Sequence, residues 1–93
     1  MKPNILLIYG GDSVEHEISI ITALQIKKNY TGKYNLILCY LKNGNFYISD
    51  KLESLNKYKN LKEKAITFIP NTNYIIKNRK KIIFEAVWIV SHG

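Results

Sequence analysis

A paired-glycine turn followed by carboxylates is the first part of the chain whose residue types could do chemistry. Gly10 and Gly11 come directly after an apolar run, and the next six residues hold three carboxylates: Asp12, Glu15 and Glu17. Glycines let a ligand approach the backbone, and a helix start supplies N–H groups without intrahelical partners. The carboxylates disfavour a phosphate and favour a cationic group such as a substrate ammonium. The spacing also lacks the third glycine of a dinucleotide-binding turn and the lysine of a P-loop.

A histidine near the end of the sequence is the second candidate. His92 follows the apolar run Ala86–Val90, much as Gly10 follows Ile5–Tyr9. Ligands of open parallel sheets bind beyond the carboxyl ends of the strands. His92 and the glycine turn are therefore expected to face one another if their strands are near neighbours. As a single histidine, His92 fits a structural role equally well.

The residues after the glycine turn also have a structural interpretation. Asp12 or Ser13 can serve as the N-cap of a following helix. With Asp12 as the N-cap, Glu15 stands at the third helical position, where it could close a capping box. His16 and Glu17 would then be surface residues of the first turn. Both interpretations of Glu15 remain open at this point.

The elements expected to position these residues follow a strand–helix–strand order. Ile5–Tyr9 is typical of a strand buried on both faces. A helix is predicted over about Val14 to Lys28, and Tyr34–Leu41 is predicted as a second apolar strand. This βαβ pattern predicts parallel strands joined by a right-handed crossover. Four apolar residues of the helix recur on one predicted buried stripe: Val14, Ile18, Ile21 and Leu24.

Shorter elements are expected in the second half of the chain. Asn43-Gly44 predicts a hairpin turn leading into a strand at Phe46–Ile48. Residues 50–64 predict a loop or a short helix, and Ala86–Val90 predicts an interior strand. Three further runs predict short edge strands: Ile66–Ile69, Tyr74–Lys77 and Lys81–Phe84.

Together these elements predict an α/β fold with a mostly parallel open sheet and a short β-hairpin insertion. Only one helix has a clear pattern, although such a sheet needs helices on both faces. No element follows Gly93 that could cover the sheet. We therefore expect a truncated domain, a fragment of a longer protein.

Length and composition narrow the possible functions. A chain of 93 residues allows one small domain, which excludes an enzyme that encloses its substrates between several domains. The single cysteine, Cys39, excludes an internal disulfide and predicts a buried strand thiol in a reducing cytoplasm. No segment resembles a signal peptide or approaches the roughly 18 apolar residues of a membrane-spanning helix. We expect a cytoplasmic protein with no membrane partner.

The net charge of +7 is unevenly distributed along the chain. Residues 1–26 carry one basic and three acidic residues, whereas residues 27–84 hold the other 13 basic residues against three acidic ones. A nucleic-acid interface would use these lysines, with Tyr58 and Tyr74 for stacking. The chain has one arginine and no recognised nucleic-acid motif, so a solvated lysine-rich surface is preferred. No nucleic-acid partner is expected.

The glycine motif resembles the opening of the D-alanine–D-alanine ligases, which are ATP-grasp ligases. Their pattern Gly-Gly-x-Ser-x-Glu-His/Arg-Glu-Val-Ser is similar to the ten residues from Gly10 to Ser19. The hairpin around Asn43-Gly44 and the final Val87–Gly93 extend the resemblance, and residues 50–85 match poorly. Asp12 and Ser91 depart from the family pattern, which leaves the particular substrate open.

The resemblance implies that residues 1–93 are a Rossmann-like (pre-ATP-grasp) N-terminal substrate-binding domain, without the central and ATP-grasp domains. In this family ATP phosphorylates the carboxylate of a first D-alanine, and the amine of a second attacks the acylphosphate. Glu15 matches the glutamate that binds the first substrate's ammonium and orients the hydrogen bonds of the active site, and His92 matches the histidine near that substrate's carboxylate. Four more residues would shape the floor of the site: Gly10, Gly11, Ser13 and Val14.

The resemblance also implies cofactors and partners. The full-length enzyme would use ATP and Mg²⁺, whose binding residues lie beyond residue 93, so this fragment alone is expected to be inactive and to bind neither. The product would serve peptidoglycan precursor synthesis, and family members are usually homodimers. The alternatives are a D-alanine–D-lactate or D-alanine–D-serine ligase, a stand-alone Rossmann-like module that binds a small molecule, and a basic nucleic-acid binder.

Overall fold

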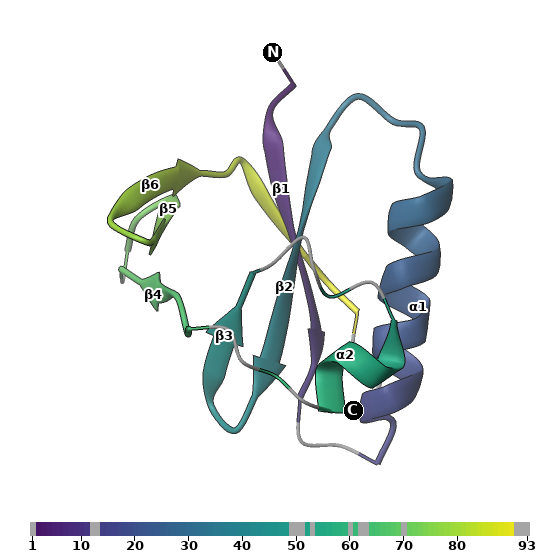
Figure 1. Ribbon diagram of the computed structural model, residues 1–93. Helices are drawn as coiled ribbons and strands as arrows, with labels where there is room; N and C mark the ends of the chain where they lie inside the picture. Colours follow the sequence, from purple (N-terminus) through teal and green to yellow (C-terminus); the bar gives the residue numbers. More distant parts are fainter. Residues whose placement is uncertain are drawn as a thin grey trace.

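Two β-sheets and one long helix organise the chain (Figure 1). The computed structural model describes residues 2–11, 14–48, 52, 54–59, 61, 64–69 and 71–90. Strands β3, β2, β1 and β7 form a mixed sheet in that order, and β4, β5 and β6 form a separate sheet. The elements are β1 (Asn4–Gly10), α1 (His16–Asn29), β2 (Asn35–Lys42), β3 (Asn45–Tyr47), α2 (Leu55–Lys59), β4 (Thr67–Phe68), β5 (Tyr74–Lys77), β6 (Lys80–Ile83) and β7 (Ala86–Ile89).

Strand β1 lies at the centre of the mixed sheet. It pairs in parallel with β2, where Ile5 is opposite Leu36, and with β7, where Ile5 is opposite Ala86. Strand β3 returns antiparallel to β2 through the turn at Asn43 and Gly44, both of which have positive φ. The predicted βαβ unit, the hairpin and the mostly parallel sheet are therefore confirmed.

The two faces of the mixed sheet are covered by different elements. On one face, Leu7 and Tyr9 pack with Ile20 and Ala23 of α1. On the other face, Leu6 packs in a cluster with residues of the second sheet, including Ile75. Alternate residues of a strand point to opposite faces, so a continuous apolar run such as that of β1 supplies both cores.

The helix buries a different face from the predicted one. Its buried residues are Ser19, Ile20 and Ala23. Of the predicted stripe, Leu24 packs against the core, whereas Val14, Ile18 and Ile21 are exposed. Small residues allow a helix to approach a sheet closely. The hydroxyl of Ser19 also accepts a hydrogen bond from the Gly10 N–H at 2.8 Å, which fixes the rotation of α1 toward the end of β1.

Strand β7 is an edge strand of the described sheet, not the predicted interior strand. It pairs with β1 on one side, and all four of its residues are exposed. Its large apolar side chains are at least two-fifths exposed: Val87 45%, Trp88 42% and Ile89 63%. The apolar run therefore indicated a strand correctly but gave its position in the sheet wrongly.

The three short strands that precede β7 form a sheet of their own. Strands β4, β5 and β6 pair antiparallel, and Asn78 and Arg79, both with positive φ, join the last two. The sequence predicts short edge strands here, and the structure shows a second layer that covers one face of the mixed sheet (Figure 1). Residues 50–64 contain α2, the short helix that was one of the two expectations.

Three buried tyrosines link β1, β2 and α2. The Tyr58 hydroxyl donates to the Leu52 carbonyl at 3.1 Å, so the Tyr9 hydroxyl, 2.6 Å away, donates to the Tyr58 oxygen. The ring of Tyr40 contacts both, with centroids 5.6 Å from Tyr9 and 4.7 Å from Tyr58. Burial raises the pKa of all three phenols, so they stay neutral hydrogen-bonding groups at physiological pH.

The hydrogen bonds from Tyr9 to Tyr58 and from Tyr58 to Leu52 predict unequal losses of stability for two matched substitutions. Tyr58→Phe leaves the Leu52 carbonyl and the Tyr9 hydroxyl without their partner, and we expect it to lower the free energy of unfolding by about 2–3 kcal/mol. Tyr9→Phe removes only a donor, and we expect a loss of about 1 kcal/mol. Urea unfolding followed by circular dichroism measures both. Equal losses in the two variants would contradict the direction assigned to the hydrogen bonds.

Candidate functional site

The glycine turn lies at the carboxyl end of β1 and is held against the end of β2. Gly10 and Gly11 have φ of +94° and +88°, and the Gly11 N–H donates to the Leu41 carbonyl at 2.9 Å. A Cβ atom on Gly10 would lie 2.5 Å from the Leu41 carbonyl oxygen and 2.9 Å from the Tyr40 ring. Glycine is therefore required at position 10 both for backbone conformation and for space.

A buried serine ties the start of α1 to this turn. The Ser19 hydroxyl accepts from the Gly10 N–H at 2.8 Å and donates to the His16 carbonyl at 2.7 Å. Ser19 is the buried polar residue among the described residues, at 1% exposure. Its bonds place the first turn of the helix beside the carboxyl end of β1.

His16 bridges the glycine turn and β2. Its Nδ1 contacts the Gly11 carbonyl, and because a carbonyl only accepts, Nδ1 carries the proton. Nε2 is hydrogen-bonded to the Tyr40 hydroxyl, 2.5 Å away, and the two rings are nearly perpendicular. The prediction that His16 is a surface residue of the first turn is wrong, whereas Glu17 is exposed as predicted.

Glu15 stands at the N-cap of α1, not at the third helical position. The helix begins at His16, and the Glu15 side chain makes no capping hydrogen bond. Glu15 is therefore not at the third helical position that the capping-box interpretation requires, and Asp12, its predicted partner, lies outside the described residues. Glu15 is half-buried beside the glycine turn, and the neighbouring Val14 is fully exposed.

The second candidate region begins at the end of β7. Strands β1 and β7 are direct parallel neighbours, and the Val90 N–H donates to the Ile8 carbonyl at 2.8 Å. The carboxyl ends of both strands therefore lie at one edge of the sheet. The sequence prediction required the strands that precede the glycine turn and His92 to be near neighbours, and they are. His92 itself and Ser13 of the glycine motif lie outside the described residues.

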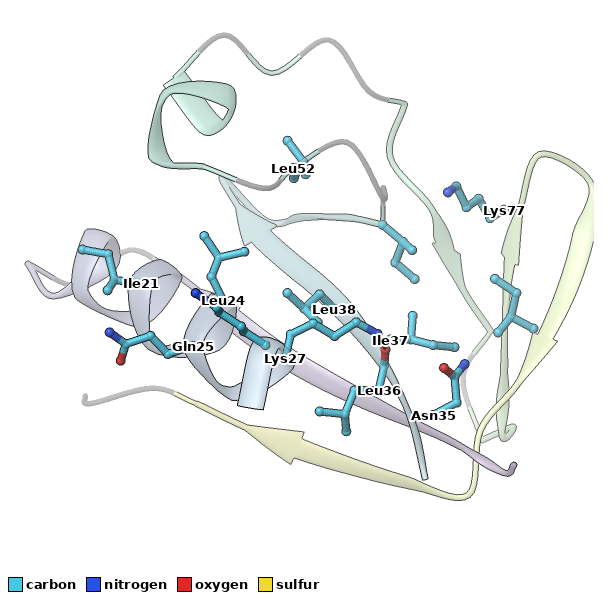
Figure 2. Close-up of a pocket in the computed structure, with 13 residues that line it drawn as sticks. Ile21, Leu24, Gln25, Lys27, Asn35, Leu36, Ile37, Leu38, Leu52 and Lys77 are labelled. Carbon is cyan, nitrogen blue, oxygen red and sulfur yellow. Dashed lines mark hydrogen bonds between the residues drawn. The ribbon is translucent and has the colours of Figure 1, made fainter. Parts of the chain in front are cut away.

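A cavity lined by α1, β2 and residues of the second sheet lies away from this edge (Figure 2). Its volume is about 840 Å³, and it opens between α1, β2 and the second sheet. Its β2 residues come from the amino-terminal half of that strand, Asn35 to Leu38, whereas the glycine turn lies beside Leu41. Lys27 donates to the Leu36 carbonyl there at 2.7 Å. The cavity is thus separate from the candidate site.

Other chemistries find little support in the part of the chain that is described. Burial raises the pKa of the Cys39 thiol to about 12, so this residue is a poor nucleophile, as its apolar strand predicted. The described residues hold no group of three side chains suited to a metal ion. None of their helices combines the length and apolar character needed to cross a bilayer.

The sequence missed two residues that shape the turn. Tyr40 touches His16 from 24 positions away, and Ser19 bonds a residue of another element. The sequence nevertheless contains a feature that points to each of these two residues. Tyr9 and Tyr40 both stand near the ends of apolar runs and are paired in the sheet, and Ser19 is a small polar residue three positions after His16.

Known proteins resemble the chain over its whole length. The family described as D-ala D-ala ligase N-terminus matches residues 4–93. The D-alanine--D-alanine ligase of Thermosipho melanesiensis is 36% identical, covering 97% of this chain and 28% of the relative. The enzyme of the same name from Borrelia duttonii is 31% identical, covering 100% and 27%. A third, from Legionella pneumophila, is 34% identical, covering 99% and 26%.

A solved structure shows the same fold. The VanG D-Ala:D-Ser ligase from Enterococcus faecalis superposes with a TM-score of 0.77 at 20% identity, covering 96% of this chain and 29% of that one. The chain spans a little over a quarter of the length of the curated relatives. Since the family match covers nearly all of its residues, the chain belongs to the D-alanine–D-alanine ligase family, in which it corresponds to the N-terminal region.

Proposed function

We propose that residues 1–93 form the N-terminal substrate-binding domain of a longer D-alanine–D-alanine ligase. The observation that carries the proposal is the placement of Glu15 at the start of α1, beside the Gly10–Gly11 turn at the carboxyl end of β1. The β1–β2–β7 sheet fits the first part of a Rossmann-like fold, in which ligands bind at this edge. The exposed apolar side chains of β7 support the presence of further chain that covers it.

The site suits the ammonium of an amino acid. The Glu15 carboxylate offers a charge-assisted contact, which stabilises binding by roughly 1.5–3 kcal/mol. The N–H groups at the start of α1 and His92 would face the substrate carboxylate. Gly10, Gly11, Ser13 and Val14 would shape the floor. The role of Glu15 is to position the first D-alanine, so that its carboxylate can become an acylphosphate and then react with the amine of the second.

The glycine turn of this chain does not suit the phosphates of ATP, and the described residues hold no group of three side chains that could bind a metal ion such as Mg²⁺. Three carboxylates follow the glycine turn in the sequence and would repel phosphate, and no lysine follows the turn within the motif. Both would bind other parts of the full-length enzyme, and no step assigned to this chain involves them. The proposed enzyme is a cytoplasmic homodimer that supplies peptidoglycan precursors and binds neither nucleic acid nor membrane.

Activity of the full-length protein tests the proposal. With D-alanine, ATP and Mg²⁺, we expect D-alanyl-D-alanine, ADP and phosphate to form in equal amounts. Residues 1–93 alone serve as a control and should give no turnover. D-Lactate and D-serine as second substrates decide between the related ligases. The absence of any product with all three acceptors would overturn the proposal.

His92 gives a further prediction for the full-length enzyme. Because it would contact the carboxylate of the first D-alanine, we expect His92→Ala to raise the KM for that substrate by about tenfold, a loss of about 1.4 kcal/mol. The melting temperature should stay within a few degrees of the wild type. A collapsed melting transition would instead assign His92 a structural role.

A further inference from the structure

We propose that His16 is a positioning residue, which holds the Gly11 carbonyl and thereby fixes the glycine turn for the substrate. The inference rests on the proposed function, since it takes the turn as part of the D-alanine site. The imidazole of His16 bridges two groups: Nδ1–H donates to the Gly11 carbonyl, and Nε2 is hydrogen-bonded to the Tyr40 hydroxyl.

Gly11 depends on hydrogen bonds for its position. Apart from Gly11 and its chain neighbours, no atom lies within 4 Å of the place where its Cβ would be, and its φ is +88°. Packing therefore does not hold its peptide groups on that side. Its N–H donates to the Leu41 carbonyl, and its own carbonyl accepts from His16. Of these two bonds within the described part of the chain, removal of the imidazole would leave the one to the Leu41 carbonyl.

The imidazole is itself held from behind by buried groups. Tyr40 is 1% exposed, and its hydroxyl is hydrogen-bonded to Nε2 at 2.5 Å. The Tyr40 ring packs against Tyr58 at 4.7 Å, and Tyr58 is bonded to Tyr9. This packing fixes the orientation of the His16 ring, so that Nδ1 points at the Gly11 carbonyl.

The position of His16 couples the turn to Glu15. His16 is the first residue of α1 and directly follows Glu15 at the N-cap. Its main-chain carbonyl accepts from Ser19, whose oxygen also accepts from the Gly10 N–H. The backbone and the side chain of His16 therefore both tie the start of the helix to the turn. Loss of the side-chain tie would let Gly11 move relative to the Glu15 carboxylate.

A matched pair of substitutions separates the two contacts of the ring. The amide nitrogen of asparagine is as many bonds from Cβ as Nδ1 of histidine, so His16→Asn keeps a donor for the Gly11 carbonyl. The amide nitrogen of glutamine lies one bond further from Cβ, as Nε2 of histidine does. His16→Gln therefore keeps a polar group that can reach the Tyr40 hydroxyl. His16→Ala removes both contacts.

In the full-length enzyme we expect His16→Ala to raise the KM for D-alanine by about tenfold, because small misplacements of binding groups are costly. The KM for ATP should stay unchanged. His16→Asn should recover most of the loss, and His16→Gln should recover little. Amide hydrogen exchange of Gly10 and Gly11 gives a readout that is independent of activity: it should accelerate in the alanine and glutamine variants and stay near wild type in the asparagine variant.

Each of the other outcomes has a definite meaning. Recovery by glutamine equal to that by asparagine would overturn the role of the Gly11 contact, as would an unchanged KM for D-alanine in His16→Ala. If His16→Ala does not fold, the comparison of asparagine with glutamine still decides. A wild-type enzyme without ligase activity overturns the proposed function, and the order of exchange rates then still reports whether His16 holds the turn.

Discussion

Glu15→Gln is expected to lower kcat/KM for D-alanine by roughly 10- to 100-fold in the full-length enzyme. The amide has the size of the carboxylate but lacks its charge, so the contact with the substrate ammonium loses its charge assistance. The KM for ATP should not change, because the nucleotide would bind other domains. Steady-state kinetics with each substrate varied in turn measure both constants.

Glu17→Gln is the matched control for this prediction. Glu17 lies two positions further along the same turn of α1 and is exposed. Glu17→Gln removes one negative charge from the same end of the helix as Glu15→Gln does, so a general electrostatic effect would appear in both variants. We expect Glu17→Gln to behave as wild type. Equal losses in the two variants, or none in Glu15→Gln, would refute the ammonium contact.

Gly10→Ala is expected to destabilise the protein by about 3 kcal/mol or more, from a strained φ together with overpacking. The new methyl group would meet the Leu41 carbonyl oxygen at 2.5 Å and the Tyr40 ring at 2.9 Å. The carbonyl belongs to the backbone of β2 and cannot move without disturbing its pairing with β1. Urea unfolding followed by circular dichroism measures the loss.

Gly11→Ala separates the two sources of this cost. Gly11 has a similar φ of +88°, but no atom lies within 4 Å of its Cβ position. It should therefore show the backbone strain alone, about 1–2 kcal/mol. Gly44→Ala, at φ +79° in the hairpin turn and also without close neighbours, gives a second control away from the site. Equal destabilisation by Gly10→Ala and Gly11→Ala would contradict the steric argument.

Local patterns predicted the main elements well. The apolar runs of β1 and β2, the glycine turn between β1 and α1, and the Asn43-Gly44 hairpin all follow from residue types within a few positions of one another. The buried Cys39 thiol follows from the same local pattern. Backbone conformation and alternation along a strand are decided locally, so they can be inferred from short segments.

The rotation of α1 could not be predicted in this way. The predicted apolar stripe ran from Val14 to Leu24, yet only Leu24 of its four residues packs against the core. The buried residues of the helix are instead Ser19, Ile20 and Ala23. Apolar residues are spread around this helix, so periodicity alone did not select a face. The sheet selected it, through the close approach that Ala23 allows and the hydrogen bond between Ser19 and Gly10.

By itself, the sequence determined the βαβ unit, the glycine turn and the family motif that surrounds Glu15, because each is encoded in contiguous residues. The tertiary structure decided that β7 lies beside β1, that β4 to β6 form a separate layer, and that His16 contacts Tyr40. These depend on strand order and on contacts between distant residues, which no local pattern specifies. The glycine turn could thus be predicted from ten residues, but the groups that hold it in place come from β2 and α1.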